Sequence, residues 1–132
     1  MNCYCGSNTS YQQCCDKLIK GQKQAQTPEQ LMRSRYAAYA TGEFGYIHQT
    51  YSQQHADIPD VEEIRQHALG TQWLQLTIES SRVVMNSGEV EFRAIYQQDG
   101  VLYQLHERSA FVVENGQWRY LSGEILPDSG PL

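Results

Sequence analysis

Four cysteines in the first fifteen residues constrain this chain more than any other feature. Cys3, Cys5, Cys14 and Cys15 follow the pattern C-x-C-x8-C-C, and no other cysteine occurs in the sequence. Four thiolates on one short segment can surround a zinc ion tetrahedrally, and such a site has no open coordination position. The pattern therefore predicts one structural zinc ion. We expect Ser7 or backbone amides to donate hydrogen bonds to the sulfurs.

Two other states of these thiols stay open. A disulfide needs Cα atoms about 4.4–6.8 Å apart, which disfavours adjacent pairs but allows a cross-pair such as Cys3–Cys14. Disulfide scaffolds belong mainly to oxidising compartments. The N-terminus, Met-Asn-Cys-Tyr-Cys, has neither the basic nor the apolar region of a signal peptide. The thiols could also be inert. Zinc in a cytoplasmic protein is the favoured interpretation.

Composition limits the class of protein. A chain of 132 residues suffices for one domain with a small appendage. The hydrophobic fraction of 40% excludes a disordered chain. No apolar stretch approaches the roughly 20 residues that cross a bilayer. The net charge of −5 does not favour a nucleic-acid surface.

The first half of the chain carries helix signals. Thr27-Pro28-Glu29-Gln30 combines an N-cap, a proline at the first helical position and a capping-box glutamine, and the helical spacing ends at Gly42. A short helix is predicted over residues 43–51. A second capping box, Asp60 to Glu63, begins a helix that reaches Gly70. Residues 17–26 are polar and indicate a connector.

After Gly70 the hydrophobic period changes from about 3.6 residues to two, which indicates strands. Alternation predicts strands over residues 73–85, 89–97, 101–113 and 118–121, joined by tight turns such as Asp99-Gly100. In the first strand Leu74, Leu76 and Ile78 are predicted to face inward. Strands joined by tight turns are antiparallel, and helices that precede such a meander indicate an α+β fold.

The cysteine spacing resembles the SEC-C motif, and later landmarks resemble the YchJ-like family of bacterial proteins. The landmarks occur in the family's order at residues 31–36, 73–77, 106–109 and 116–120. Tyr4 stands where the motif usually has proline, and the second SEC-C copy of longer members is not present in this sequence. The resemblance implies a domain like nuclear transport factor 2, a cone of bent sheet behind about three helices.

The resulting domain plan has three parts. Residues 1–26 form a SEC-C-like zinc hook with its connector, residues 27–125 form the cone-shaped α+β domain, and residues 126–132 form a frayed tail. Within the cone domain, strand alternation places Glu107 and Ser109 on the apolar, inward face of the third strand. His106 lies on the opposite, polar face and is expected to be exposed.

A buried carboxylate is costly unless it is paired. The favoured interpretation of Glu107 is therefore a salt bridge to an arginine, either Arg33, Arg35 or Arg82. Because Arg33 and Arg35 are two residues apart on a helix, at most one can enter the cone. A carboxylate that holds or acts on a ligand is the first alternative, and a bulge that turns Glu107 outward is the second.

The leading functional hypothesis is a protein-interaction module in which zinc orders the hook as a docking surface, because similar SEC-C segments contact a chaperone. The alternative is a small-molecule-binding protein or enzyme that uses the pocket around Glu107. No Ser-His-Asp, phosphate-loop or dinucleotide signature is present, so no reaction is predicted. The sequence is also compatible with a homodimer. An open pocket with Glu107 unpaired would favour the alternative, whereas a cone filled by Trp118, Tyr120 and Phe92 would favour the docking module.

Overall fold

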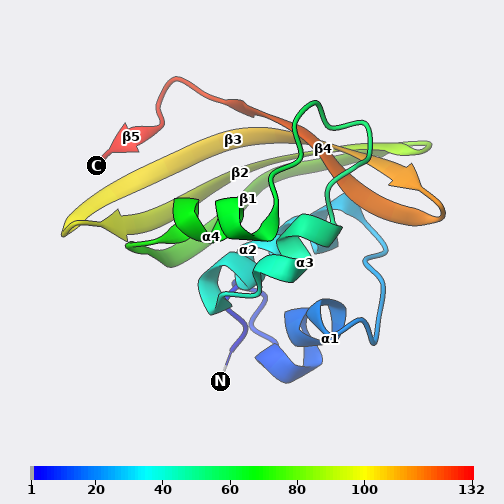
Figure 1. Ribbon diagram of the computed structural model, residues 1–132, viewed down its shortest axis with the longest axis horizontal. Coiled ribbons are helices and arrows are strands. Elements are labelled where there is room, and N and C mark those ends of the chain that lie inside the picture. The colour runs from blue at the N-terminus through cyan, green and yellow to red at the C-terminus, as the bar shows by residue number, and fades with distance from the viewer. Residues whose placement is uncertain (1) are drawn as a thin grey trace.

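A computed structural model describes residues 2–132 as a curved antiparallel sheet over a layer of helices, with the hook against the far side of that layer (Figure 1). The helices are η1 (Tyr11–Gln13), α1 (Cys15–Ile19), α2 (Pro28–Thr41), α3 (Phe44–Gln49) and α4 (Val61–Ala68). The strands are β1 (Thr71–Val84), β2 (Ser87–Gln98), β3 (Val101–Glu114), β4 (Gln117–Ile125) and β5 (Gly130–Pro131). The predicted α+β cone is confirmed.

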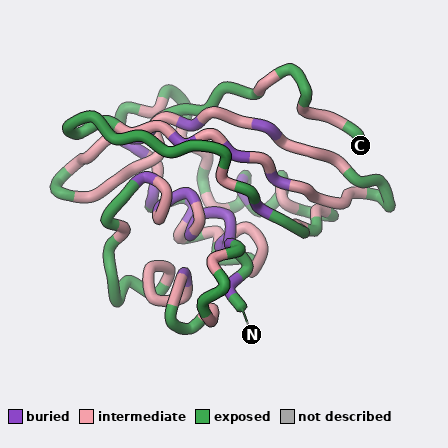
Figure 2. Tube along the Cα trace, turned by 180° about the vertical axis from the view of Figure 1, so that it is seen from behind, coloured by how far each residue is buried: buried purple, intermediate pink, exposed green. Residues whose placement is uncertain are grey.

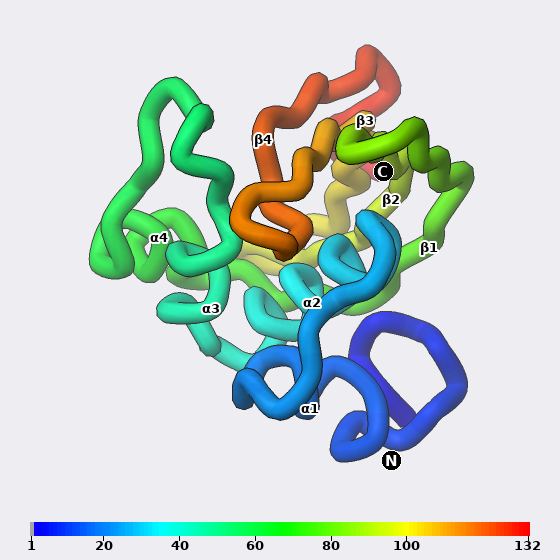
Figure 3. The backbone as a smooth tube through the Cα atoms, turned by 90° about the vertical axis from the view of Figure 1, so that its right-hand side faces the viewer, coloured from blue at the N-terminus to red at the C-terminus, as the bar shows by residue number. Residues whose placement is uncertain are grey.

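Helix α2 is the centre of the molecule. The Thr27 side chain accepts a hydrogen bond from the Gln30 amide at 3.1 Å, and Gly42 ends the helix in the left-handed conformation at φ 80°. Five consecutive residues, 34–38, are buried. Five consecutive positions point to every side of a helix, so α2 is enclosed all round. Figure 3 shows what encloses it: the sheet on one side, α3 and α4 on another, and the hook below.

The other helices largely follow the predicted signals. Asp60 and Glu63 form the expected reciprocal capping box at the start of α4. In α2 the capping box is modified, because the Gln30 side chain accepts from the Gln26 amide and not from Thr27. Helix α1 was not predicted. It occupies the beginning of the stretch that was interpreted as a connector.

The sheet has the strand order β1-β2-β3-β4, with every pair antiparallel. Asp99-Gly100 and Asn115-Gly116 both have positive φ at each residue, which is the geometry of two-residue hairpin turns. Register shifts interrupt the β1–β2 and β3–β4 ladders. Such bulges increase twist and bend strands, and they give the sheet the curvature visible in Figure 1.

A bulge corrects one predicted orientation. The β1 register shifts between Trp73 and Gln75, so Leu74 leaves the alternation and is 46% exposed. Trp73 takes the inward position in its place and packs on Tyr96 with ring centroids 5.0 Å apart. Leu76 and Ile78 keep the predicted inward orientation. Figure 2 shows the resulting core, with buried residues along α2 and on the middle strands.

The C-terminal residues are not frayed, contrary to the prediction. β5 pairs with β3 through Tyr103 and Gln104, and the Leu132 amide donates to the Leu102 carbonyl at 3.0 Å. The tail thereby continues along the edge of β3 beyond the end of β4. Among residues 2–132, no helix is long and apolar enough to span a bilayer.

Candidate metal centre and cone pocket

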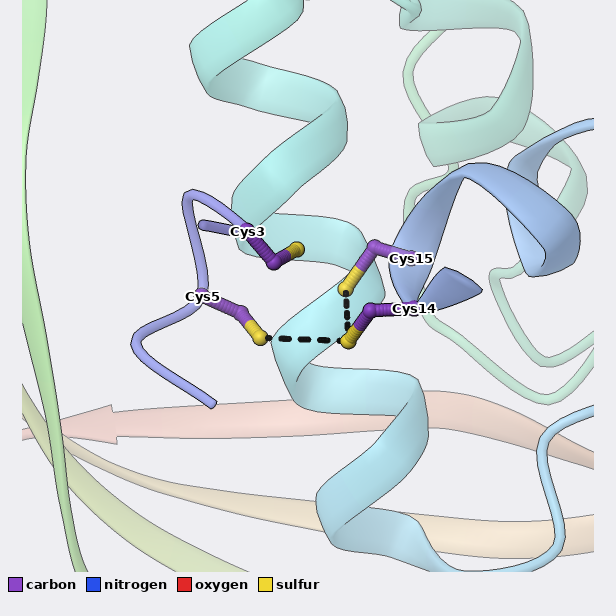
Figure 4. A group of neighbouring side chains, drawn as sticks. All are labelled: Cys3, Cys5, Cys14 and Cys15. Atoms are coloured by element: carbon purple, nitrogen blue, oxygen red, sulfur yellow. Dashed lines mark hydrogen bonds between the residues drawn. The ribbon is translucent and has the colours of Figure 1, made fainter. Parts of the chain in front are cut away.

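The four cysteines meet at one point beside α2 (Figure 4). Their sulfurs all lie within 4.8 Å of one another, with 3.7 Å between Cys5 and Cys14 and 3.9 Å between Cys14 and Cys15. Zinc–sulfur bonds of about 2.3 Å in tetrahedral geometry place sulfurs about 3.8 Å apart. The cluster therefore fits a single tetrahedral metal ion.

Local structure brings the two cysteine pairs together. Gly6 and Asn8 adopt positive φ of 83° and 64°, and the Cys3 amide donates to the Thr9 carbonyl at 2.7 Å. This turn returns the chain so that the start of α1 presents Cys14 and Cys15 to the first pair. Ser7 Oγ lies 3.2 Å from the Cys14 sulfur, which is the supporting hydrogen bond expected from the sequence.

Hydrogen bonds among the thiols shift their pKa values in opposite directions. The hydrogen bond from Cys15 lowers the pKa of the Cys5 thiol to about 4, and Ser7 contributes to the same effect. That bond raises the pKa of Cys15, and burial raises it further. A metal ion would replace the thiol protons, so metal affinity must fall in acid.

The hook is joined to the main core. Cys3, Cys5 and Cys15 are at most 5% exposed and pack in the same cluster as residues of α2 and β1. Arg33 adds a polar link, because its Nη1 donates to the Cys5 carbonyl at 2.6 Å while its Nε pairs with Glu29 at 2.9 Å. The cysteine cluster therefore supports one side of α2.

The opposite side of α2 faces a cavity of about 370 Å³, the cone pocket. It is mostly lined by apolar and aromatic side chains, among them Met32, Tyr36, Ile64, Trp73, Phe92 and Leu105. Tyr120 and Phe92 form walls and do not fill the space. Burial raises the pKa of Tyr39, another lining residue, to about 12, so its hydroxyl stays a neutral donor.

Glu107 lies in the wall of this pocket without an arginine partner. Its Oε2 accepts hydrogen bonds from Ser109 at 2.6 Å and from the Tyr120 hydroxyl at 3.2 Å. Among residues 2–132 it forms no salt bridge: Arg33 pairs with Glu29 and Arg82 with Glu89. The predicted ion pair is therefore wrong. The strand face was predicted correctly, and two hydroxyls fill the role assigned to the arginine.

Arg35 enters the same pocket, which sequence reasoning left undecided. Its Nη1 donates to the Ile47 carbonyl at 3.0 Å and to Thr50 Oγ1 at 2.5 Å. The guanidinium carbon lies 4.7 Å from the ring centroid of Tyr51 and 4.5 Å from that of Tyr120. Stacking between two aromatic faces favours a buried cation. As expected, only one of Arg33 and Arg35 enters the cone.

His106 is on the outer face of the sheet, as predicted, but it is only 7% exposed. The C-terminal tail covers it: Nδ1 lies 2.6 Å from Asp128 and Nε2 lies 2.8 Å from Glu91. Two carboxylates around both ring nitrogens favour the doubly protonated ring. Hydrogen bonds that His106 donates to Asp128 and then to Glu91 raise the pKa of His106. The expectation of an exposed side chain is wrong because the tail was assumed to fray.

Fold and site together define a domain like nuclear transport factor 2 with an N-terminal four-cysteine motif. The family described as YchJ, middle NTF2-like domain, matches residues 27–123. A UPF0225 protein of Vibrio parahaemolyticus is 40% identical over 92% of this chain and 74% of its own length. The chain therefore belongs to the YchJ-like family, which confirms the resemblance found in the sequence.

Solved structures agree with this assignment. A SEC-C motif containing protein from Rhodopseudomonas palustris has a TM-score of 0.89 at 38% identity, covering 96% of this chain and 99% of that one. A second such protein, from Psychrobacter arcticus, has a TM-score of 0.80 at 27% identity, with coverage of 94% and 82%. Both likenesses extend over most of this chain.

Proposed function

We propose that this protein binds a small molecule in the cone pocket, and that a structural zinc ion in the hook supports the helix that forms the pocket wall. One observation carries the pocket assignment. Glu107 borders an open, mainly apolar cavity of about 370 Å³ and has no cationic protein partner among the described residues. Ligand sites commonly combine volumes of about 300–1,000 Å³ with a few polar groups in apolar walls.

Zinc is the metal that best matches the donor set. Soft thiolate ligands select zinc over magnesium, calcium or manganese, which prefer oxygen. Cys3, Cys5, Cys14 and Cys15 would hold the ion, and all four positions would be filled by sulfur. Such an ion contributes to folding and offers no position for substrate. Its role here would be to fix the hook against α2.

The docking role of the hook is a separate proposal. Its support is the exposed outer side of the hook, where Tyr4 is 41% exposed and packs edge-on against Tyr11 with centroids 5.3 Å apart. A partner bound there would not compete with the pocket, because the cysteine cluster lies on the other side of α2. We therefore assign small-molecule binding first.

A fragment screen followed by amide NMR shifts tests the pocket assignment. We expect hits to perturb pocket residues such as Trp73 and Leu105. Replacing half-buried Ala68 at the pocket margin by tryptophan should abolish these shifts. Hits confined to other surfaces, or no hits from the whole library, would overturn the assignment. Elemental analysis of protein purified under reducing conditions should separately find about one equivalent of zinc.

A further inference from the structure

The cone pocket contains two opposite charges that do not pair with each other. Arg35 and Glu107 both line the cavity, yet no salt bridge joins them. Building on the proposed small-molecule function, we propose that the ligand is a small zwitterion. Its carboxylate would lie at Arg35, its ammonium group at Glu107, and an apolar or aromatic body would fill the cavity. An apolar amino acid has this chemistry.

Arg35 offers donors that the protein does not use. The residue is 3% exposed, and only its Nη1 has protein acceptors. No side-chain nitrogen or oxygen within residues 2–132 is both fully buried and without a hydrogen-bond partner. Nε and Nη2 must therefore border open space, and the cavity that Arg35 lines is that space. Guanidinium donors match a carboxylate in geometry and charge.

Glu107 offers an acceptor in the same way. Both protein hydrogen bonds reach Oε2, and Oε1 has no partner among the described residues. A carboxylate with one occupied oxygen and one free oxygen is fixed in place and can still receive a donor. An ammonium group would make a charge-assisted hydrogen bond there.

Tyr120 sets the separation of the two charges. Its ring lies 4.5 Å from the guanidinium carbon of Arg35, and its hydroxyl lies 3.2 Å from Glu107 Oε2. The guanidinium thus lies over the face of this ring, and the carboxylate lies at its hydroxyl end. A ligand with its own two charges close together can reach both groups across this ring.

Ligands with a single charge fit less well. A simple cation would meet Glu107 but would be repelled by Arg35 in the same low-dielectric cavity. A simple anion would meet Arg35 but would be repelled by Glu107. Arg35 already occupies one face of Tyr51 and one face of Tyr120, so those two faces are not free for a ligand cation. Only a ligand with both signs compensates both groups, and Trp73, Phe92 and Leu105 provide the apolar surface.

A matched set of compounds tests this inference by NMR titration or calorimetry. Phenylalanine and leucine carry both charges, 3-phenylpropanoate and 4-methylpentanoate lack the ammonium group, and 2-phenylethylamine and 3-methylbutylamine lack the carboxylate. We expect at least one amino acid to bind the pocket at least tenfold tighter than its two analogues, since each charged hydrogen bond contributes about 1.5–3 kcal/mol. Either analogue binding as tightly as its amino acid would overturn the inference.

Two variants locate the contact. Glu107→Gln should remove most of the preference for the amino acid over the analogue without ammonium. Glu43→Gln, an exposed carboxylate outside the pocket, should keep the full preference. A preference that survives Glu107→Gln would contradict the assignment. If fragments bind the pocket but none of the six compounds does, the zwitterion is wrong and the proposed function stands. If nothing enters the pocket, the proposed function itself fails.

Discussion

Gly123 pairs with Ser109 across the β3–β4 ladder, and the space beside its Cα holds the Glu107 carboxylate and the Tyr120 hydroxyl. A Cβ at this position would overlap both groups. The absence of a side chain at residue 123 is therefore a condition for the hydrogen bond between Glu107 and Tyr120. Gly123, near the end of β4, is in this way part of the polar wall of the pocket.

Gly123→Ala should disturb this wall. We expect a loss of about 1–3 kcal/mol in unfolding free energy, typical of overpacking, together with displaced NMR signals around Glu107. Gly45→Ala is the matched control, because residue 45 lies in α3, where an added Cβ would meet nothing within 4 Å and φ is not positive. It should stabilise the protein by about 0.5–1 kcal/mol. Equal urea midpoints for the two variants would contradict the prediction.

Glu107→Gln should change stability by less than about 1 kcal/mol. The glutamine oxygen can still accept from Ser109 and Tyr120, and no buried cation loses its partner. Arg35→Met should cost more, because the buried Thr50 hydroxyl loses the donor that it accepts from and two aromatic rings lose the stacked guanidinium, at about 1–3 kcal/mol for an unsatisfied group. Urea unfolding of both variants gives the comparison. A cost of about 3–5 kcal/mol for Glu107→Gln would instead indicate a buried ion pair.

Removing the metal should lower the stability of the whole protein and not only loosen the hook. Three of the four cysteines pack in the same core as residues of α2 and β1. If loss of the metal lets these cysteines move away, that core is exposed. Thermal unfolding under reducing conditions should show a lower midpoint after chelation, and Cys14→Ser should reproduce it. An unchanged midpoint in Cys14→Ser would show that the hook is energetically independent. Zinc affinity should also weaken in acid, as the thiols regain protons.

The C-terminal tail, residues 126–132, should be attached to β3 more firmly in mildly acidic solution than in alkaline solution. The contacts with Asp128 and Glu91 raise the pKa of His106. Arg93 and then His106 lower the pKa of Asp128, and His106 lowers the pKa of Glu91. The raised histidine pKa gives stabilisation that is fully present below about pH 6.5 and lost as pH rises through the folded-state value. The lowered carboxylate pKa values give stabilisation that is lost in acid. Attachment should therefore be strongest between about pH 4.5 and 6.5.

Backbone heteronuclear NOE values at Ser129 and Gly130 measure this attachment. They should fall between pH 6 and pH 9 in the native protein and show no such change in His106→Gln. Arg93 also binds Asp128, at 2.7 Å, and Arg108 binds Glu91 at 3.3 Å, so some attachment should persist at high pH. His48→Gln should leave the transition unchanged. A pH-independent tail in the native protein would refute the prediction.

Patterns within a few residues predicted most of the fold. The cysteine spacing, the capping boxes and the change of period after Gly70 each depend on neighbours in the chain. The structure has the cysteine cluster, the complete Asp60–Glu63 box and the strands after Gly70, whereas at Thr27 only the N-cap half of the box forms. The predicted inward orientation of Leu74 was wrong because a bulge adds one residue to a strand without changing its hydrophobic pattern. Helix α1 was missed because its five residues are too few to show a helical period.

The candidate site was only partly predictable for a different reason. Alternation identified the face on which Glu107 lies, but the partner of a carboxylate depends on which side chains from distant elements reach it. His106 illustrates the same limit, since its partner Asp128 is 22 residues away and was assigned to a frayed end. The size of a cavity depends on packing across all its walls, and no local pattern reports that.

Tyr120 also restricts how the pocket can exchange its contents. Its amide donates to the Thr50 carbonyl, and its carbonyl accepts from the Ser52 amide, both at 2.8 Å. Glu114 holds the following loop through the Gln53 amide at 3.1 Å. These bonds tie the end of α3 to β4, so this side of the pocket is closed by backbone. If the pocket binds a ligand as proposed, we expect exchange on the α4 side, where side chains such as Ala68 line the cavity, and the rate of ligand release should then follow the motion of that short helix.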